Sequence, residues 1–350
     1  MTEDTHADLR ADLHADVVVV GGGTAGLAAA VALARSRRSV VVVDAGEPRN
    51  APADGAHNVL GQEGISPLEL LARGRAEAEG YGVRVVRGLV TGASGVVDDF
   101  RLEVDGADEG DGAVQRVTAR RVILAAGLVD QLPDVPGVAE GWGHSVLHCP
   151  FCHGWEVRDQ RIAVLGTTEN ALHQVMLFRQ LSDDVTFFVH DAPEPTEEQW
   201  DQLAALGVRV VTPRVERLVV DGRQVQAVEV EGGRSFPMDA VVVAPRFVAR
   251  TELYEALGGE RTVTPFGEHV APDPRGATAV PGVWVAGNTG DLMAMVVAAA
   301  ASGVMAGAAV HGDLAVADLA KAVAERRAPF SAAMESEVHE AVLADRRHGV

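Results

Sequence analysis

The two cysteines of the chain, Cys149 and Cys152, lie two residues apart in the sequence CPFCHG at residues 149–154. Such a pair can form a small disulfide that opens by thiol exchange, for which an accessible thiolate is needed. The same letters match the CxxCH motif of haem attachment, and with His148 and His153 the pair has ligand types that bind zinc. Redox, haem and zinc chemistry are the three interpretations that the rest of the sequence must decide between.

Length and composition indicate a globular protein with a sizeable core. The chain has 350 residues, of which 47% are hydrophobic, and this length is typical of two domains. Residues 1–16 contain no apolar run and fit neither a secretory signal nor a membrane span. We therefore expect a cytoplasmic location, where structural disulfides are rare and a redox-active pair is favoured. Haem attachment would need export, and zinc would need two more well-separated ligands. We expect no metal.

The charge balance excludes some partners. The net charge is −20, and Lys321 is the single lysine among 30 basic residues. Nucleic acids and anionic membranes are bound by basic patches that displace counterions. We therefore expect neither nucleic acid nor a membrane as a partner.

The N-terminal part of the sequence predicts a dinucleotide site. Residues 16–20 form a β-branched run suited to a buried parallel strand, and a GxGxxG turn and an Ala/Leu-rich helix follow it. In this turn Gly21 permits the tight bend, Gly23 lets backbone amides approach a pyrophosphate, and Gly26 allows helix and strand to pack closely. Thr24 and Ala25 complete the turn. Asp44 ends the next predicted strand, where an acid can accept hydrogen bonds from a ribose.

Two further apolar strands end in small residues, at 121–127 and at 281–288. The second continues into a long helix that we expect to run through Gly307. Small residues at strand ends let the backbone approach a large cofactor. These segments therefore favour a cofactor site assembled from both ends of the chain, although each also fits an ordinary buried strand.

A second, altered copy of the nucleotide unit follows the cysteine pair. Residues 161–165 predict its strand, Gly166 begins its turn, and a helix is expected over 171–181. Thr168 stands where Gly23 stands in the first copy, so a side chain occupies the place of the pyrophosphate, and Glu169 adds a negative charge.

The segment after the second strand of this unit lacks the arginines that would bind the 2′-phosphate of NADPH. NADPH is therefore disfavoured as a second cofactor. Two alternatives stay open: Arg179 or Arg209 reaches into the site, or NADH binds with Asp191 on its ribose.

Together these motifs resemble the thioredoxin-reductase-like, FAD-dependent pyridine nucleotide-disulfide oxidoreductases. The resemblance rests on the N-terminal GxGxxG, the CxxC ahead of a second nucleotide unit, and the strand ending in Gly287-Asn288, and it extends to about Asp313. Within the family, CPFCHG is similar to the CPxCHG branch of dithiol oxidases that act on disulfide metabolites such as holomycin and gliotoxin. Ordinary thioredoxin reductases carry Asp where this chain has His153.

The resemblance implies an α/β fold with two Rossmann-like domains and a homodimer. The FAD domain would comprise residues 1–130 and 250–350, with a helical tail at 314–350, and an inserted NAD(P)H-like domain would span 131–249 and carry the CxxC. An acidic hairpin and loop at 98–112 would belong to the FAD domain. In the tail we expect two separate helices, at 315–327 and 331–347.

The resemblance also assigns roles to individual residues. Cys152 would face the flavin, Cys149 would exchange with the substrate sulfur, and His153, or else His148, would accept and return thiol protons. The residues expected to contact FAD are Gly21, Gly23, Thr24, Ala25, Gly26, Asp44, Asn50, Gly127, Gly287 and Asn288.

The expected activity is the oxidation of a dithiol to a disulfide with O2 as acceptor and H2O2 as product. The substrate would be a small-molecule dithiol or a thioredoxin-like protein. Two alternatives stay open at this point: an NAD(P)H-dependent thioredoxin-disulfide reductase, and a flavin-binding redox sensor without catalysis.

Overall fold

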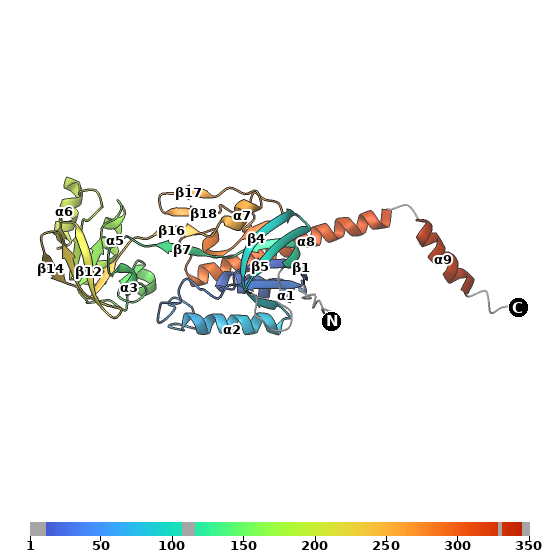
Figure 1. Cartoon of the computed structure of the whole chain (residues 1–350), viewed down its shortest axis with the longest axis horizontal. Coiled ribbons are helices and arrows are strands. Elements are labelled where there is room, and N and C mark those ends of the chain that lie inside the picture. The colour runs from blue at the N-terminus through green and yellow to red at the C-terminus, as the bar shows by residue number, and fades with distance from the viewer. Residues whose placement is uncertain (1–11, 107–115, 328–330, 345–350) are drawn as a thin grey trace, which may run out of the picture. The chain divides into compact units, whose positions relative to one another are not determined.

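The computed structural model describes residues 12–106, 116–327 and 331–344 (Figure 1). The chain divides into two compact units, residues 1–309 and 310–350. Parts of the predictions about the N-terminal segment (1–11), the acidic loop (107–112) and the tail (345–347) lie outside the described residues. The domain boundaries expected at 131 and 249 stay a prediction.

A seven-stranded sheet forms the base of the first unit. Its strands follow the order β3-β2-β1-β6-β5-β4, and β19 pairs with β6. β1, β2, β3, β6 and β19 pair in parallel, whereas β4 and β5 form an antiparallel hairpin. Val20 and Leu124 pair where β1 and β6 end, and parallel sheets bind ligands at such carboxyl ends. The bounds are β1 (Asp12–Val20), β2 (Val40–Asp44), β3 (Arg84–Arg87), β4 (Leu89–Val96), β5 (Asp99–Asp105), β6 (Arg116–Leu124) and β19 (Val283–Val285).

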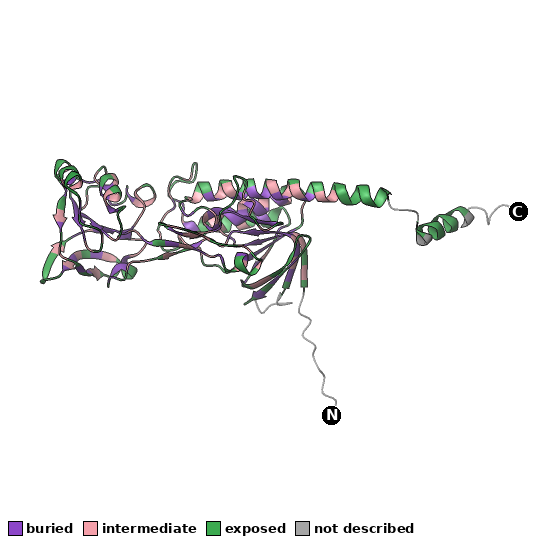
Figure 2. Ribbon diagram, turned by 90° about the horizontal axis from the view of Figure 1, so that it is seen from above, coloured by how far each residue is buried: buried purple, intermediate pink, exposed green. Residues whose placement is uncertain are grey.

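Helices α1 (Thr24–Arg35) and α2 (Pro67–Gly80) pack against this sheet, and the first turns of α8 (Val296–Arg327) pack onto α1. Glycines bring α8 onto α1, because a Cβ at Gly303 would lie 2.0 Å from the carbonyl oxygen of Ala25. By length and composition α8 is the described helix that qualifies to cross a membrane. Its first turns pack closely onto α1, and Figure 2 shows buried residues along them.

The second parallel sheet has the order β11-β10-β9-β15-β8. Its two faces are both buried: Val164 belongs to one hydrophobic cluster, which includes Phe178 of α5, and Leu165 belongs to another, which includes Leu218 of β12. A fully buried sheet explains its continuous apolar strands. The bounds are β8 (Val146–Leu147), β9 (Ile162–Leu165), α5 (Ala171–Phe178), β10 (Val185–Phe188), α6 (Glu197–Ala205), β11 (Arg209–Val211) and β15 (Ala240–Val242), with an antiparallel layer of β12 (Val215–Asp221), β13 (Gln224–Val230) and β14 (Arg234–Pro237).

The strands that lead into and out of this second sheet pair with each other. β7 (Leu128–Gln131) and β16 (Arg246–Ala249) run antiparallel, with Leu128 opposite Ala249. They extend a four-stranded sheet of order β17-β18-β16-β7. The remaining elements are α3 (Val138–Gly141), α4 (Pro150–His153), α7 (Glu252–Ala256), β17 (Thr262–Thr264), β18 (Gly267–His269) and the 3-10 turn η1 (Gly287–Thr289).

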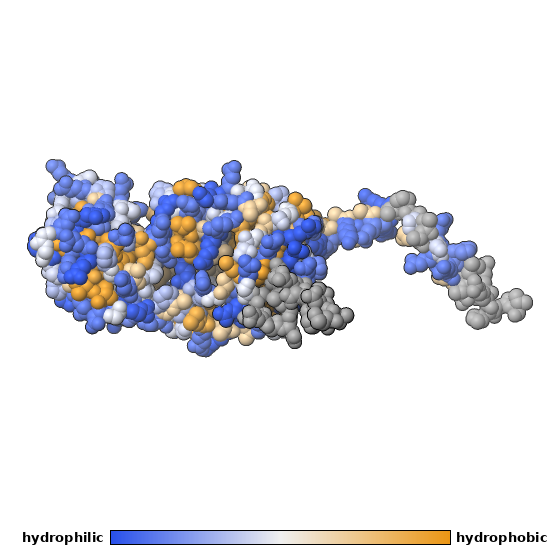
Figure 3. Space-filling view, in the orientation of Figure 1, coloured by the Kyte–Doolittle hydropathy of each residue, from blue (hydrophilic) through white to orange (hydrophobic). Residues whose placement is uncertain are grey.

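The C-terminal part differs from the sequence prediction. Instead of one helix through Gly307 and another over 315–327, α8 runs without a break to Arg327, because Gly312 weakens a helix without ending it. α9 (Ala332–Ala344) is separate, as expected. Single apolar side chains such as Val316 and Leu319 are exposed on α8 among the hydrophilic ones that Figure 3 shows along its last turns.

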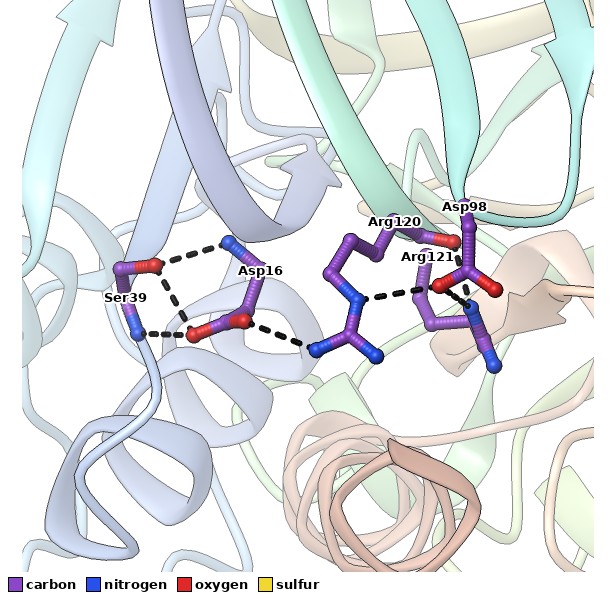
Figure 4. A network of polar contacts seen from close by, with 5 residues as sticks. All are labelled: Asp16, Ser39, Asp98, Arg120 and Arg121. Carbon is purple, nitrogen blue, oxygen red and sulfur yellow. Dashed lines mark hydrogen bonds and ion pairs between the residues drawn. The ribbon is translucent and has the colours of Figure 1, made fainter. Parts of the chain in front are cut away.

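A network of charges joins neighbouring strands at the end of the first sheet opposite its carboxyl edge (Figure 4). Asp16 accepts hydrogen bonds from the backbone and hydroxyl of Ser39, which ties β1 to the residue before β2. Asp98 accepts from Arg120 at 3.0 Å and from the buried Arg121 at 2.9 Å. Burial alone would raise the pKa of Asp98, but these hydrogen bonds and the two positive charges outweigh it and lower the pKa.

Asp98→Asn should separate this charge effect from backbone effects. Asp98 has a φ of +68°, which Asn also tolerates, so the turn is preserved while the charge is lost. We expect a loss of about 1 kcal/mol in the free energy of unfolding near neutral pH, since the half-exposed carboxylate is screened by solvent.

The pH dependence provides the check. A carboxyl with a lowered pKa stabilises the fold above its ordinary value of 3.8 and loses this effect as the pH falls through the folded-state pKa. Denaturant unfolding at several pH values should therefore show the two proteins converging in acid. A difference that is constant with pH would contradict the charge explanation.

Candidate functional site

A cleft of about 1600 Å3 lies in the first unit, at the carboxyl ends of β1 and β6. Its walls include the first glycine turn, the disulfide turn and the turn of the second nucleotide unit. The predicted site residues that line it are Gly21, Gly23, Thr24, Ala25, Asp44, Asn50, Gly127, Cys149, Cys152, His153, Gly287 and Asn288. Gly26 is not among the lining residues. The structure thus brings together side chains that the sequence spreads over more than 260 positions.

The first glycine turn has the geometry that a pyrophosphate needs. Gly21 has a φ of +104°, and a Cβ there would lie 2.3 Å from the carbonyl oxygen of Ala125. A Cβ at Gly26 would lie 1.9 Å from the carbonyl oxygen of Gly21, so this glycine serves packing. A Cβ at Gly23 would meet no protein atom within 4 Å. Gly23 therefore leaves open space at the N-terminus of α1, where backbone N–H groups favour a phosphate.

Asp44 is held in place at the edge of the same turn. Its Oδ1 accepts a hydrogen bond from the backbone N–H of Gly22 at 3.1 Å, and its Oδ2 accepts one from Arg75 at 2.8 Å. A Cβ at Gly22 would lie 2.6 Å from the carboxyl carbon of Asp44. The sequence analysis missed Gly22 and Arg75; the run of three glycines was the one local signal for Gly22.

The 3-10 turn η1 borders the cleft beside the N-terminus of α1, next to Ala25. Gly127 donates its backbone N–H to the hydroxyl of Thr289 at 2.9 Å, and Gly287 donates to Ser302 at 2.8 Å. The side-chain amide of Asn288 donates to the carbonyl oxygens of Asp291 and Ala294. These side chains fix the loop that borders the cleft. Contact of Asn50, Gly287 and Asn288, and of the other predicted site residues, with FAD stays a prediction.

Cys149 and Cys152 form a disulfide at the start of α4. The sulfur of Cys149 accepts a hydrogen bond from the backbone N–H of Cys152 at 3.2 Å. Because the two sulfurs are bonded to each other, neither is left to ligate zinc. Phe151 and Trp155 are 66% and 65% exposed, so apolar surface is accessible beside the disulfide. The two cysteines are half-buried and line the cleft, so a thiol that enters the cleft can reach this bond.

Histidines surround the disulfide, and burial keeps two of them neutral. Burial lowers the pKa of His153, against an opposing effect of Glu156, while the charges of His57 and His144 lower it further. Burial and then the positive charge of Arg49 lower the pKa of His148 to about 4. Both imidazoles are therefore neutral near pH 7 and able to accept a proton.

Arg49 joins distant parts of this wall. Its guanidinium makes two hydrogen bonds to the carboxylate of Asp130, at 2.6 and 2.7 Å, and lies over the ring of Phe247. The ring of His148 meets the same Phe247 edge-on. Nothing in the sequence indicated this cluster, because its members are brought together only by the folding of β7 and β16.

The second nucleotide unit has a different electrostatic character. Asp191 receives two hydrogen bonds from Arg214, both at 2.8 Å, and both residues line the cleft. The hydrogen bonds from Arg214 lower the pKa of Asp191. Arg214 is a residue that the sequence analysis missed, since it lies on the loop before β12.

The arginines that the sequence offered as alternatives point elsewhere. Arg179 pairs with Asp183 and Arg209 lies near Asp184, and neither is among the cleft-lining residues. In this structure neither arginine reaches the nucleotide turn, so this alternative from the sequence finds no support here. Their own neighbouring carboxylates hold them.

A glycine turn on one parallel sheet and an accessible disulfide beside a second sheet define a flavin-dependent disulfide oxidoreductase. A family profile described as pyridine nucleotide-disulphide oxidoreductase matches residues 15–303, and the chain belongs to this family. FAD is its cofactor, and the open space at Gly23, the N-terminus of α1 and the carboxylate of Asp44 fit that group. The predicted family, fold class and flavoprotein chemistry are confirmed.

Individual relatives agree with this assignment. Thioredoxin reductase tcpT of Claviceps purpurea is 32% identical over 302 residues, covering 83% of this chain and 92% of the relative. Thioredoxin reductase sirT of Leptosphaeria maculans is 31% identical, covering 87% and 96%. The crystal structure of HlmI is 43% identical with a TM-score of 0.81, and the match covers 89% of this chain and 96% of HlmI.

Gly23→Ala should weaken FAD binding, whereas Gly26→Ala should lower the stability of the fold. The Cβ added at residue 23 has room in the protein but occupies the phosphate position, so we expect a folded protein whose FAD affinity falls at least roughly tenfold. The Cβ added at residue 26 collides with backbone and should lower the unfolding temperature. Flavin absorbance after desalting and thermal unfolding of the apoproteins measure both. Full flavin retention in Gly23→Ala would contradict the assigned phosphate site.

Proposed function

We propose that this protein oxidises a dithiol substrate to a disulfide and passes the electrons to O2, which is released as H2O2. The observation that carries the proposal is the contrast between the two nucleotide units. The first offers open backbone to a phosphate at Gly23, whereas the second carries Thr168 at the corresponding position and a closed Asp191–Arg214 pair in the cleft. This contrast favours a cycle that uses FAD without NADPH.

The Asp191–Arg214 pair opposes NADPH in two ways. Among the described residues, Arg214 is the arginine that lines this part of the cleft, and its guanidinium donates both hydrogen bonds to the carboxylate of Asp191. A 2′-phosphate would have to displace that carboxylate. The carboxylate also repels that phosphate directly. Asp191 remains suited to a ribose hydroxyl, so any nicotinamide nucleotide bound here would be NADH.

The disulfide turn supplies the exchange chemistry. A thiolate of the substrate attacks the sulfur of Cys149, so that the Cys149–Cys152 bond breaks and Cys152 leaves with the electron pair. The second substrate thiol then attacks the mixed disulfide, which releases the substrate disulfide and leaves both cysteines reduced. His153, neutral at pH 7, accepts the proton of the incoming thiol. FAD, when bound, supplies the two-electron acceptor that restores the enzyme disulfide and transfers the electrons to O2.

The exposed Phe151 and Trp155 support access from solvent, and they fit either a small-molecule dithiol or a thioredoxin-like protein. A homodimer and a cytoplasmic location stay predictions from the sequence.

An NAD(P)H-dependent thioredoxin-disulfide reductase is the second candidate. The names of the relatives favour it. So do two buried side-chain oxygens in the second nucleotide unit, Oγ1 of Thr167 and Oε1 of Gln174. These atoms have no hydrogen-bond partner, and both residues line the cleft. A nucleotide could supply the missing donors.

Anaerobic reduction of the bound flavin distinguishes the two candidates. We expect a small dithiol to bleach the flavin rapidly and NADPH to do so at least roughly a hundredfold more slowly, because the second unit repels its phosphates. Admitting air should restore the flavin absorbance and produce one H2O2 per disulfide formed. Rapid bleaching by NADPH would overturn the proposal in favour of the reductase. Cys149→Ser is the matched control: it should keep its FAD and lose reduction by the dithiol.

The pH dependence should identify the base. Because burial lowers the pKa of His153 below its ordinary value of 6.5, this imidazole stays neutral into mildly acid solution. The rate of dithiol-driven flavin reduction should therefore hold from neutral pH to below 6.5 and then fall. His153→Asn should slow the reaction roughly a hundredfold and remove this acid limb. A limb that persists in His153→Asn and lies near pH 4 would assign the role to His148 instead.

A further inference from the structure

The loop of residues 56–65, between β2 and α2, is closed on itself. At its base, Ala56 donates its backbone N–H to Ile65 at 2.8 Å and accepts one from Gly64 at 3.0 Å. Inside the loop, the carboxylate of Glu63 contacts Nδ1 of His57 at 2.8 Å and accepts the backbone N–H of Asn58 at 2.9 Å. The loop therefore has a defined shape of its own.

A neighbouring helix supports the tip of this loop from outside. Arg73 of α2 donates a hydrogen bond to the side chain of Gln62 at 2.8 Å. Asn58 has a φ of +59°, a left-handed conformation that Asn adopts more readily than most residues. The conformation of the loop thus presents the Asn58 side chain in one direction.

The 56–65 loop contacts the disulfide turn at two points, although about 90 residues separate them in sequence. The side-chain amide of Asn58 donates to the carbonyl oxygen of Phe151 at 2.7 Å. Nε2 of His57 lies 3.4 Å from the carboxylate of Glu156, just beyond the motif. The first contact falls between the two cysteines.

The Phe151 carbonyl belongs to the same peptide group as the N–H of Cys152. That N–H points to Cys149, at 3.2 Å from its sulfur and 3.3 Å from its carbonyl oxygen. A hydrogen bond to the oxygen of a peptide group polarises the group and makes its N–H a stronger donor. The amide of Asn58 therefore acts on the sulfur of Cys149 through one peptide unit.

We propose that Asn58 is a positioning residue for Cys149. It fixes the peptide group between Phe151 and Cys152 and strengthens the hydrogen bond that this group donates to the Cys149 sulfur. When the disulfide is opened, the same N–H stabilises negative charge on that sulfur and so increases its thiolate fraction. The role of Cys149 as the exchanging thiol rests on the proposed function, whereas the effect of Asn58 on the sulfur does not.

Alkylation of the reduced holoenzyme tests this directly. Asn58→Gly keeps the left-handed backbone and removes the amide. The wild type and the variant are reduced, desalted without oxygen and treated with iodoacetamide across a range of pH, and mass spectrometry reports the rate at Cys149. We expect the midpoint of the rate-pH curve to move to higher pH and the rate near neutral pH to fall about threefold in Asn58→Gly, as for the loss of one hydrogen bond.

Two further variants separate positioning from a general loosening of the loop. Arg223→Ala removes the hydrogen bond that Arg223 donates to the carbonyl oxygen of Pro52 at 2.6 Å. This contact joins the chain just before the 56–65 loop to the turn between β12 and β13, away from the cysteines. Its midpoint should match the wild type. Asn58→Gln restores an amide donor and should recover part of the shift. An unchanged midpoint in Asn58→Gly, or an equal shift in Arg223→Ala, would overturn the proposal.

The outcome is independent of the proposed catalytic cycle. If the wild type fails to reduce its flavin with any dithiol but Asn58→Gly still shifts the alkylation midpoint, the proposed function fails and the role of Asn58 holds. If dithiols reduce the flavin in both proteins and the midpoints coincide, the proposed function holds and the proposed role of Asn58 fails.

Discussion

The cofactor half of the cleft depends on one constraint, the approach of α1 to its neighbours at distances that no side chain permits. A Cβ at Gly26 would collide with β1's turn, one at Gly303 with the backbone of α1, and one at Gly287 with Ala25 at 2.8 Å. Glycine at these three positions lets β1, η1 and α8 meet at the N-terminus of α1. One rigid surface therefore contains the N–H groups at the start of α1, the end of β6 and the loop after η1. FAD can bind to this surface.

The disulfide turn is held in a contrasting manner. None of the residues of α4 is fully buried, and its half-buried turn is anchored by a few contacts: Gly154 packs against Leu181, and Gln174 donates to the carbonyl oxygen of His148. A turn with few contacts can change its bonding between disulfide and dithiol without disturbing a core. Because so few contacts hold the turn, each of them matters for the position of the two sulfurs. A rigid cofactor surface is thus combined with a lightly held reactive turn.

The sequence predicted the parts of this site whose physical basis is local. Gly21, Gly23 and Gly26 could be assigned because strand, turn and helix follow one another directly, and the second unit was found by the same pattern. The spacing of the cysteines left redox, haem and zinc chemistry open, and the nucleotide units around the pair favoured the disulfide that the structure contains. Predicted helix and strand positions were close, except that α8 continues where two helices were expected.

Contacts between distant side chains could not be predicted in this way. Arg214 meets Asp191, Arg49 meets Asp130, and Asn58 meets Phe151 only because strands and loops far apart in sequence converge. Hydrophobic periodicity in the sequence does not indicate contacts between distant segments. In the sequence, an exposed residue such as Asn58 cannot be distinguished from an ordinary loop residue. Arg179 and Arg209, which the sequence left open as alternatives for the second unit, lie beside the nearer carboxylates of Asp183 and Asp184.

The peptide group between Phe151 and Cys152 is hydrogen-bonded at both its carbonyl and its N–H, and this affects how the CPFCHG motif should be interpreted. The letters CPFCHG specify which atoms react, but the donor that faces the carbonyl between the cysteines comes from a loop that the motif does not include. Proteins with the same six letters can therefore differ in thiol reactivity according to the residue that their loop presents. For comparison among relatives, the informative unit is the motif together with the residue across from it, and an engineer can adjust the chemistry while leaving both cysteines untouched.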